Sequence, residues 1–247
     1  MKLNLLIRTY IVENLHTSLF SLPNVISSDD VDIYVHNDNP DVIDFNRIIE
    51  KFHLQYPEYN INIIQEKENQ DMFMSYLNSI EFIDENNYWT MLLDDDDTIC
   101  NRDILDFLES NKGENVCVQY AIYNILNGAK QSTFFHWHRI YPTNQLKKIF
   151  ENKDIIVRAL LKHNKSTKFN KLEDELMFNI VQTLLSLKTI IYKKETVNHN
   201  LYTHVVNGYK SENLYNSLDD LKYILGLQKI ITNIVCDIKN DSSAIHK

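Results

Sequence analysis

The feature that most constrains the fold is an alternation, over the first half of the chain, of short apolar runs with longer amphipathic stretches. Apolar and β-branched residues dominate four runs, which we expect to be strands: 3–7, 31–36, 61–65 and 88–93. Between them, helical periodicity predicts helices at 12–22, 42–54 and 72–83. This alternation predicts parallel βαβ units with right-handed crossovers. Ligands of such sheets bind beyond the carboxyl ends of the strands.

The second half is less regular. Two apolar runs predict strands with no helix between them, at 116–125 and 133–140. Apolar residues at helical spacing then predict helices at 143–151, 155–163 and 172–187, a short strand at 190–192, and a long amphipathic helix at 214–237. Because no repeat and no Pro/Gly/Ser-rich linker interrupts the chain, we expect residues 1–247 to form one domain.

Charge excludes one class of function and leaves another open. The net charge of -9 argues against a nucleic-acid partner, which would require excess Lys and Arg. Residues 29–109 hold 21 acidic and 4 basic side chains, whereas residues 130–210 hold 14 basic and 6 acidic ones. An acidic half facing a basic half suits a metal ion and an anionic ligand held between them. Two solvated surfaces of opposite sign are the alternative.

Cysteines, glycines and apolar runs set further limits. The 3 cysteines show no CxxC spacing, which favours a reducing compartment, so we expect a cytoplasmic protein and leave peripheral membrane attachment open. No apolar run approaches the roughly 20 residues of a transmembrane helix, and the first eight residues are too short for a signal peptide. The 4 glycines are too dispersed for a Walker loop or a GxGxxG turn.

The sharpest motif is a run of four aspartates, Asp94 to Asp97, directly after the predicted strand 88–93. Carboxylates crowded together repel one another and remain ionised only when a cation compensates them. Alternate aspartates in an extended turn can offer oxygens to Mg²⁺ or Mn²⁺. The alternatives are a solvated acidic loop and, for Asp97, an N-cap of a helix over 101–109.

At Leu93–Asp97 the chain resembles the GT-A glycosyltransferases, in particular the inverting family 2, in which a strand ends in Leu-Asp-x-Asp-Asp. The resemblance implies a GT-A-like, Rossmann-like α/β fold with a mostly parallel central sheet flanked by helices and a C-terminal helical segment. It also implies that Asp94 contacts the ribose side of the donor nucleotide, with Asp95 as a further donor-binding residue. Asp96, together with Asp94, would hold Mn²⁺ or Mg²⁺.

Four other segments extend the resemblance over residues 3–211, one of them being Glu173-Asp174. Thr9 and Tyr10 resemble the turn after the first strand, which packs around the nucleotide base. Asn37 and Asp38 resemble the end of the second strand, although Asn37 replaces the first aspartate of the family pattern. Residues 202–211 resemble the closing segment, which implies that His204 approaches the metal or the diphosphate, with His199 as the alternative.

The predicted helix 172–187 begins with Glu173 and Asp174. Carboxylates in the first turn of a helix interact favourably with its dipole, by about 0.3–1 kcal/mol, which explains the cluster without any catalytic role. The resemblance implies that Asp174 is the catalytic base that deprotonates the acceptor hydroxyl, with Glu173 as the alternative.

The predicted strand 133–140 carries His136, Trp137, His138 and Arg139. Two histidines in a His-x-His pattern on a strand point the same way, which suits zinc, but no partner ligand lies at metal spacing. Aromatic packing is a second explanation. The resemblance implies that these four residues line the acceptor side.

The resemblance implies a metal-dependent glycosyltransferase that moves a sugar from a nucleotide diphosphate sugar, with UDP as the carrier, to a hydroxyl of a glycan or glycoprotein with inversion. The donor half would span about 1–110, the acceptor half about 111–211 and the C-terminal helix about 212–240. Lys210 or Arg8 would support the leaving diphosphate. The alternatives are a sugar-nucleotide pyrophosphorylase, disfavoured because residues 7–15 lack glycine, and an inactive nucleotide-sugar-binding protein.

Overall fold

The structure is a computed structural model of the 247-residue chain. It describes residues 1–9, 12–38, 44–68, 72–112, 116–126, 129–133, 139–164, 173–200 and 218–245. The strands are β1 (Leu3–Thr9), β2 (Val31–Asn37), β3 (Ile61–Gln65), β4 (Trp89–Asp94), β5 (Asp97–Ile99), β6 (Val116–Leu126), β7 (Ala129–Thr133), β8 (Arg139–Pro142) and β9 (Lys188–Asn200). The α-helices are α1 (Val12–Ser21), α2 (Phe45–Gln55), α3 (Met72–Ser79), α4 (Asp103–Ser110), α5 (Thr143–Glu151), α6 (Lys153–Asn164), α7 (Glu173–Leu185) and α9 (Leu218–Ile245).

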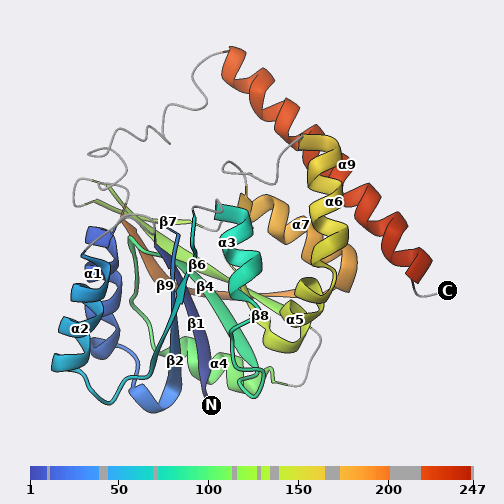
Figure 1. The fold of residues 1–247 in the computed structure, drawn as a ribbon. Helices are drawn as coiled ribbons and strands as arrows, with labels where there is room; N and C mark the ends of the chain where they lie inside the picture. The colour runs from blue at the N-terminus through green and yellow to red at the C-terminus, as the bar shows by residue number, and fades with distance from the viewer. Residues whose placement is uncertain are drawn as a thin grey trace.

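The strands form one sheet in the order β3-β2-β1-β4-β8-β6-β9-β5, with β7 paired to β6. Strands β3, β2, β1 and β4 run parallel, as the alternation of strands and helices predicts. Strand β8 is antiparallel to β4 and to β6, and β9 is parallel to β6. The expected α/β fold with parallel central strands and flanking helices is therefore confirmed (Figure 1).

Helices cover both faces of the sheet and enclose two apolar cores. Helices α1, α2 and α4 pack on one face, where Leu15, Phe52 and Leu108 are fully buried. Helices α3, α5, α6, α7 and α9 cover the other face (Figure 1). Strand β1 separates the cores: Leu5 and Ile7 belong to the first and Leu6 to the second. Every residue of β1 is buried, so both faces of this strand pack against protein, as is usual for a central parallel strand.

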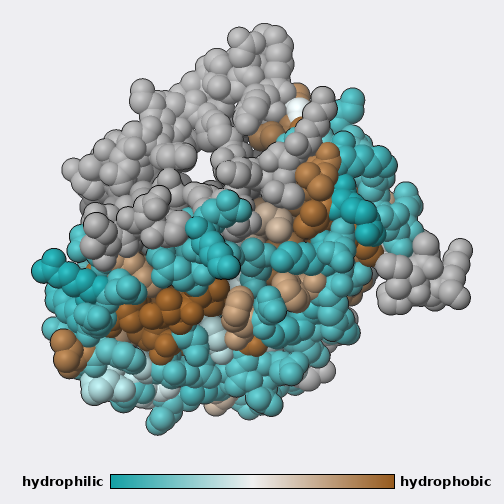
Figure 2. Space-filling view, viewed as in Figure 1, coloured by the Kyte–Doolittle hydropathy of each residue, from teal (hydrophilic) through white to brown (hydrophobic). Residues whose placement is uncertain are grey.

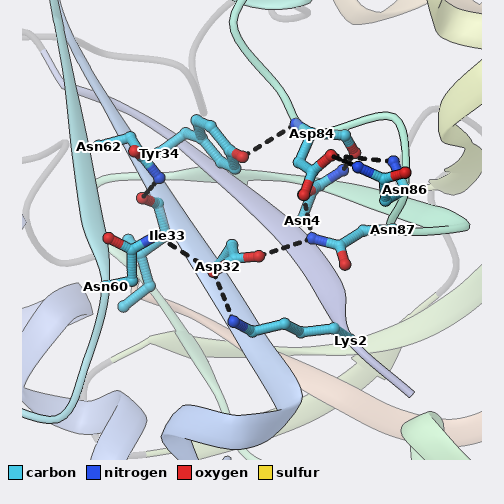
Figure 3. A network of polar contacts seen from close by, with 10 residues as sticks. All are labelled: Lys2, Asn4, Asp32, Ile33, Tyr34, Asn60, Asn62, Asp84, Asn86 and Asn87. Carbon is cyan, nitrogen blue, oxygen red and sulfur yellow. Dashed lines mark hydrogen bonds and ion pairs between the residues drawn. The ribbon is translucent and has the colours of Figure 1, made fainter.

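A network of buried polar side chains lies at the amino ends of β1, β2 and β4 (Figure 3). Asp32 accepts hydrogen bonds from Asn87 at 2.7 Å and Asn60 at 3.3 Å and pairs with Lys2 at 2.8 Å. Asn87 also donates to Asn4, 2.8 Å away. Burial alone would raise the pKa of Asp32, but these hydrogen bonds and the charge of Lys2 outweigh it and lower the pKa. The network ties three strands together at the end opposite the acidic run.

Several expected elements differ from the structure, and two of them differ only in where a helix ends: α3 ends at Ser79 instead of 83, and α9 continues to Ile245 instead of 237. Asp97 does not cap the next helix: it begins strand β5, and α4 starts at Asp103 after Arg102. The expected strand 190–192 is part of the much longer β9, whose polar half pairs with β6 and β5. The expected strand 133–140 corresponds to the end of β7 and the start of β8, with 134–138 outside the described residues. Tertiary pairing stabilises β5 and most of β9, which lack a local apolar signal.

The described surface is largely hydrophilic in the view of Figure 2, with hydrophobic residues gathered in patches. Among the residues that the structure describes, the large apolar side chains that are exposed are Leu54, Ile63, Phe82, Leu161, Ile191 and Leu225. Among the described helices, none is both long and apolar enough to cross a membrane.

Candidate active site

The carboxyl ends of β1, β2 and β4 lie side by side and bring together the described residues among those predicted for the donor site, Thr9, Asn37, Asp38, Asp94 and Asp95. The register pairs Thr9 with Asn37 and Arg8 with Asp94. The backbone amide of Asp38 donates to the carbonyl of Thr9 at 3.0 Å, which joins the two strand ends. The acidic run therefore starts at the end of an interior strand, between β1 and β8, as the sequence predicts.

Asp94, the last residue of β4, is held by two donors on one oxygen. The Nη2 atom of Arg8 and the hydroxyl of Tyr76 each lie 2.8 Å from Asp94 Oδ1. Tyr76 comes from α3, and the Arg8 guanidinium stacks on its ring, with Cζ 4.6 Å from the ring centroid. Arg8 therefore compensates part of the negative charge of the run.

Asp95 faces the opposite side of the sheet. Its Oδ2 accepts a hydrogen bond from the Thr9 hydroxyl at 2.8 Å, and Oδ1 lies 3.5 Å from Asn14 Nδ2 on α1. Asp95 is the first residue of the turn after β4, and its side chain contacts α1 whereas that of Asp94 contacts α3. Both aspartates predicted for donor binding lie at this edge, in different surroundings.

Asp96 and Asp97 are nearly fully buried, with exposed fractions of 4% and 2%. Asp96 lies in the tight turn between β4 and β5, and Asp97 pairs with His199 of β9 across the antiparallel ladder. The alternative histidine of the metal site is thus next to the acidic run along the backbone. His204, the first candidate, lies outside the described residues, as does Tyr10.

Beside Asn37 and Asp38, which are both buried, β2 carries a fully buried histidine, His36. Its Nδ1 is hydrogen-bonded to the hydroxyl of Ser79 on α3, and its Nε2 lies 3.6 Å from Glu66. Burial lowers the pKa of His36, and the nearby Arg8 adds to this, against the raising effect of Glu66 and Asp38. The His36 side chain therefore packs against α3, next along β2 to Asn37 and Asp38.

The candidate catalytic base lies at the start of a helix on the same face as Arg8 and Tyr76. Helix α7 begins at Glu173, so Glu173 and Asp174 are its first two residues, one residue later than the predicted helix start. Buried Leu176, Met177 and Ile180 place α7 in the core that also contains α3. The side chains of Glu173 and Asp174 themselves lie outside the described part of the chain.

On the predicted acceptor side, the structure describes only Arg139 of the four candidates. His136, Trp137 and His138 lie outside the described residues. Arg139 is the first residue of β8 and is 5% exposed. Burial lowers its pKa, while Tyr141 and Cys117 act in the opposite direction. Because β8 neighbours β4, this guanidinium lies on the strand next to the acidic run.

The carboxylates of the acidic run suit a hard divalent cation that is also bound by a ligand. Within the described ranges, no three His, Cys, Asp or Glu side chains are grouped closely enough to hold a metal by themselves. Mg²⁺ commonly binds through one or two carboxylates, with substrate phosphates completing its coordination. The aspartates after β4 provide such carboxylates, so the residues present fit a metal that binds together with a diphosphate.

Local sequence patterns did not identify Tyr76 or Asn14 as site residues. Both residues lie on amphipathic helices, and the spacing of apolar residues in such a helix predicts only which face is buried. Their contacts with Asp94 and Asp95 depend on how α3 and α1 pack against the sheet. A polar residue on the buried face of a helix is the one signal that would have singled them out.

Comparisons with known proteins agree on the fold. No protein-family model matches the sequence, and no curated protein matches it. Residues 1–349 of S. aureus TarS match with a TM-score of 0.61 and 16% identity, over 96% of this chain and 71% of that one. The Pyrobaculum calidifontis mannosyltransferase PcManGT, in complex with GDP-Man and Mn²⁺, matches with a TM-score of 0.61 and 8% identity. The match covers 98% of this chain and 73% of PcManGT.

A third similar structure, GalNAc-T7 with UDP, GalNAc and Mn²⁺, has a TM-score of 0.59 and 7% identity, over 81% of this chain and 44% of that one. The chain spans 63% of TarS 1–349 in its UDP complex and 43% of the longer TarS chain. These likenesses show that the protein has the GT-A fold of glycosyltransferases.

Proposed function

We propose that this protein is a glycosyltransferase that moves a sugar from a nucleoside diphosphate donor to an acceptor hydroxyl. One observation carries the proposal: in a GT-A fold, four consecutive aspartates follow directly from the carboxyl end of interior strand β4. This is the edge at which α/β sheets bind their ligands. Residues 1–247 would act as one catalytic domain, with the donor half before the acceptor half.

The donor is a UDP-sugar in this proposal. TarS has been solved with UDP and with UDP-GlcNAc, PcManGT with GDP-Man, and GalNAc-T7 with UDP. These complexes support a nucleoside diphosphate sugar as the ligand class. In this chain Thr9, Tyr10, Asn37 and Asp38 would surround the base, and Asp94 and Asp95 would lie beside the nucleotide's sugar and phosphates.

The metal in this proposal is Mn²⁺ or Mg²⁺. Asp96 would hold it, with Asp94 and His204 as further candidates and His199 as the alternative to His204. When bound, such an ion offsets the charge that develops on the departing diphosphate. Carboxylate oxygens are the ligands both ions prefer, and the complexes of PcManGT and GalNAc-T7 with Mn²⁺ support the choice.

Transfer would proceed by a single inverting displacement. Asp174, with Glu173 as the alternative, takes the proton of the acceptor hydroxyl while the oxygen of that hydroxyl bonds to the anomeric carbon of the donor sugar. The bond from that carbon to the diphosphate breaks, and its electron pair leaves with the diphosphate. Arg139, together with His136, Trp137 and His138, would line the side on which a glycan or glycoprotein acceptor binds.

The test is release of UDP or GDP from a panel of nucleotide sugars, with and without Mn²⁺. We expect Mn²⁺-dependent release by the wild-type protein and its loss in Asp96→Asn. Asp106→Asn is the matched control, because it removes the same charge from an exposed position on α4. Nucleotide-sugar binding without release would indicate an inactive binding protein. Pyrophosphate-dependent formation of a nucleoside triphosphate would indicate a pyrophosphorylase instead.

A further inference from the structure

We propose that the outer edge of β3 is a pairing surface for a second copy of this chain, which adds its own β3 antiparallel so that the two sheets join into one. The proposal goes beyond sugar transfer and does not depend on it. It rests on the open edge of β3, on the direction in which the backbone groups of this strand point, and on the absence of charge along it.

Strand β3 is the last strand at one end of the sheet, and within the described ranges it pairs with β2 alone. An edge strand presents a row of N–H and C=O groups that can pair with another chain. Ile63, in the middle of β3, is 47% exposed. Hydrophobic residues gather on the part of the surface in Figure 2 where β3 lies in Figure 1. The edge is therefore both open and partly apolar.

The ladder between β2 and β3 shows which backbone groups of β3 point outward. The carbonyl of Asn60 accepts a hydrogen bond from the amide of Ile33 at 3.1 Å, and the amide of Glu66 donates to the carbonyl of Asn37 at 3.4 Å. Backbone groups of successive strand residues point to alternate sides, so the even-numbered residues of 60–66 face β2 and the odd-numbered residues of β3 face the open edge. The outward-facing residues are Ile61, Ile63 and Gln65.

Three outward-facing residues at alternate positions fit a two-fold axis through Ile63. In an antiparallel pair about this axis, Ile63 faces its own copy, and Ile61 faces Gln65 of the second copy. Residues opposed in this way exchange both of their backbone hydrogen bonds. The side chains of Ile61 and Ile63 lie on the same face of the sheet, where Ile61 packs against the core covered by α2. The isoleucines of both copies therefore form a continuous apolar ladder across the join.

The charge distribution also favours this edge. Residues 29–109 hold 21 acidic and 4 basic side chains, so two copies repel each other across much of this part of the chain. Residues 59–65, which include the whole of β3, carry no charge. Two copies can therefore pair along β3 without placing like charges opposite each other in the paired strands.

The other end of the sheet is protected in a way that β3 is not. The part of β9 that lies before its ladder with β5 carries the exposed residues Lys188 and Lys193. Natural sheets commonly block unwanted edge pairing with charged side chains, especially Lys. Because β3 has no such residue, nothing of this kind opposes pairing along its edge.

Sedimentation of the full chain over about 1–200 µM measures the association. Pairing along one short strand buries less than the ~1,200 Å² of a standard stable interface, so we expect a weak dimer that forms at tens of micromolar. Ile63→Lys places two like charges opposite each other at the axis and should raise the Kd of the dimer by about 10-fold or more. Ile191→Lys is the matched control: Ile191 is a strand isoleucine of similar exposure, 55%, on β9, and its change should leave the Kd unaltered.

Amide hydrogen exchange of the wild-type protein tests the register without any substitution. Above the Kd, the amides of Ile61, Ile63 and Gln65 should exchange several-fold more slowly than in dilute protein, because they donate across the join. The amides of Asn62 and Ile64 bond to β2 in either state and should exchange at the same rate at both concentrations.

Three results would overturn the proposal. The first is a wild-type protein that stays monomeric over the whole concentration range. The second is a dimer whose Kd is the same in Ile63→Lys as in the wild type. The third is a dimer in which the outward-facing amides of β3 exchange as fast as in the monomer, because the interface then lies elsewhere. Release of UDP or GDP from nucleotide sugars is measured separately, so none of these results bears on the proposed transferase activity.

Discussion

At the residue scale, neighbouring polar side chains have very different surroundings although they adjoin in sequence. Asp94 and Asp95 point to opposite faces of the sheet and contact different helices. His36 is fully buried and neutral beside a predicted ligand site. Such differences determine which side chains titrate, which bind ligands and which only support their neighbours, and each can be tested by a single substitution.

The buried His36 makes stability depend on pH. Its pKa is lowered in the folded protein from the ordinary 6.5, so below that pH the unfolded chain binds a proton that the folded one does not. Stability is complete above about pH 6.5 and is lost as the pH falls toward the folded pKa, by up to about 1.4 kcal/mol per pH unit. Thermal melting from pH 7.5 to 5.5 measures this loss.

We expect the loss to be smaller in His36→Gln than in the wild-type protein. His53→Gln is the control, because His53 is exposed on α2, and it should keep the wild-type dependence. An equal loss of stability with falling pH in His36→Gln and in the wild-type protein would show that another group causes the pH dependence.

Substitution of Asp174, at the start of α7, distinguishes a catalytic role of this carboxylate from a structural one. If it is the base, Asp174→Asn should lower sugar transfer by about 10²-fold or more and leave donor binding intact. Glu175→Gln removes a carboxylate from the same helical turn and should leave transfer unchanged. Full transfer activity in Asp174→Asn, with a stability loss under about 1 kcal/mol, would reduce its role to interaction with the helix dipole and turn attention to Glu173.

At the scale of elements, the two ends of the parallel strands are specialised. The amino ends carry the satisfied network around Asp32, which joins β1, β2 and the segment before β4 (Figure 3). The carboxyl ends carry the acidic run, where charges of one sign are concentrated. Stability and ligand binding are thus supported at opposite edges of the same strands.

We therefore expect Asn87→Ala to destabilise the protein without affecting nucleotide binding. The change removes two hydrogen bonds, one to Asn4 and one to Asp32, whose Oδ2 atom loses this donor while Oδ1 keeps Lys2 and Asn60. The free energy of unfolding should fall by about 1–3 kcal/mol in urea titrations. Asn86→Ala, at an exposed neighbouring position, should change it by less than about 0.5 kcal/mol. A matching loss of nucleotide affinity in Asn87→Ala would mean that the two edges are coupled.

At the scale of the whole molecule, the C-terminal helix is joined to the candidate catalytic helix. Ile231, Ile234 and Ile238 of α9 are buried in the core shared with α6 and α7. Asp237 accepts from Lys162 and His163 of α6 at 2.6 and 2.7 Å, and these hydrogen bonds lower its pKa. Helix α9 thus braces α7, whose first residues are Glu173 and Asp174.

Ile234→Ala should lower the free energy of unfolding by about 2–4 kcal/mol, since it leaves a cavity in this shared core. Leu225→Ala on the same helix is the matched control: Leu225 is 64% exposed, so its loss should cost little. Chemical denaturation of both variants measures the difference. Equal, small effects would show that α9 does not stabilise the rest of the protein.

The sequence by itself determined the elements whose signal is local. Apolar runs placed β1 to β4 within two residues of their observed bounds, and helical spacing located α5 and α6. It also placed the acidic run at a strand's carboxyl end, because the apolar residues of the strand and the aspartates of the run are consecutive in the chain. These patterns suffice because each depends on residues that adjoin along the chain.

Only the tertiary structure decided which side chains meet. The contact of Arg8 with Asp94 spans 86 positions, and that of Tyr76 with Asp94 spans 18. Likewise, Asp97 was expected to cap a helix but begins strand β5, because it pairs with His199 of β9. Strand register and helix packing set these contacts. Both minimise the free energy of the whole chain, so no local window of sequence contains them.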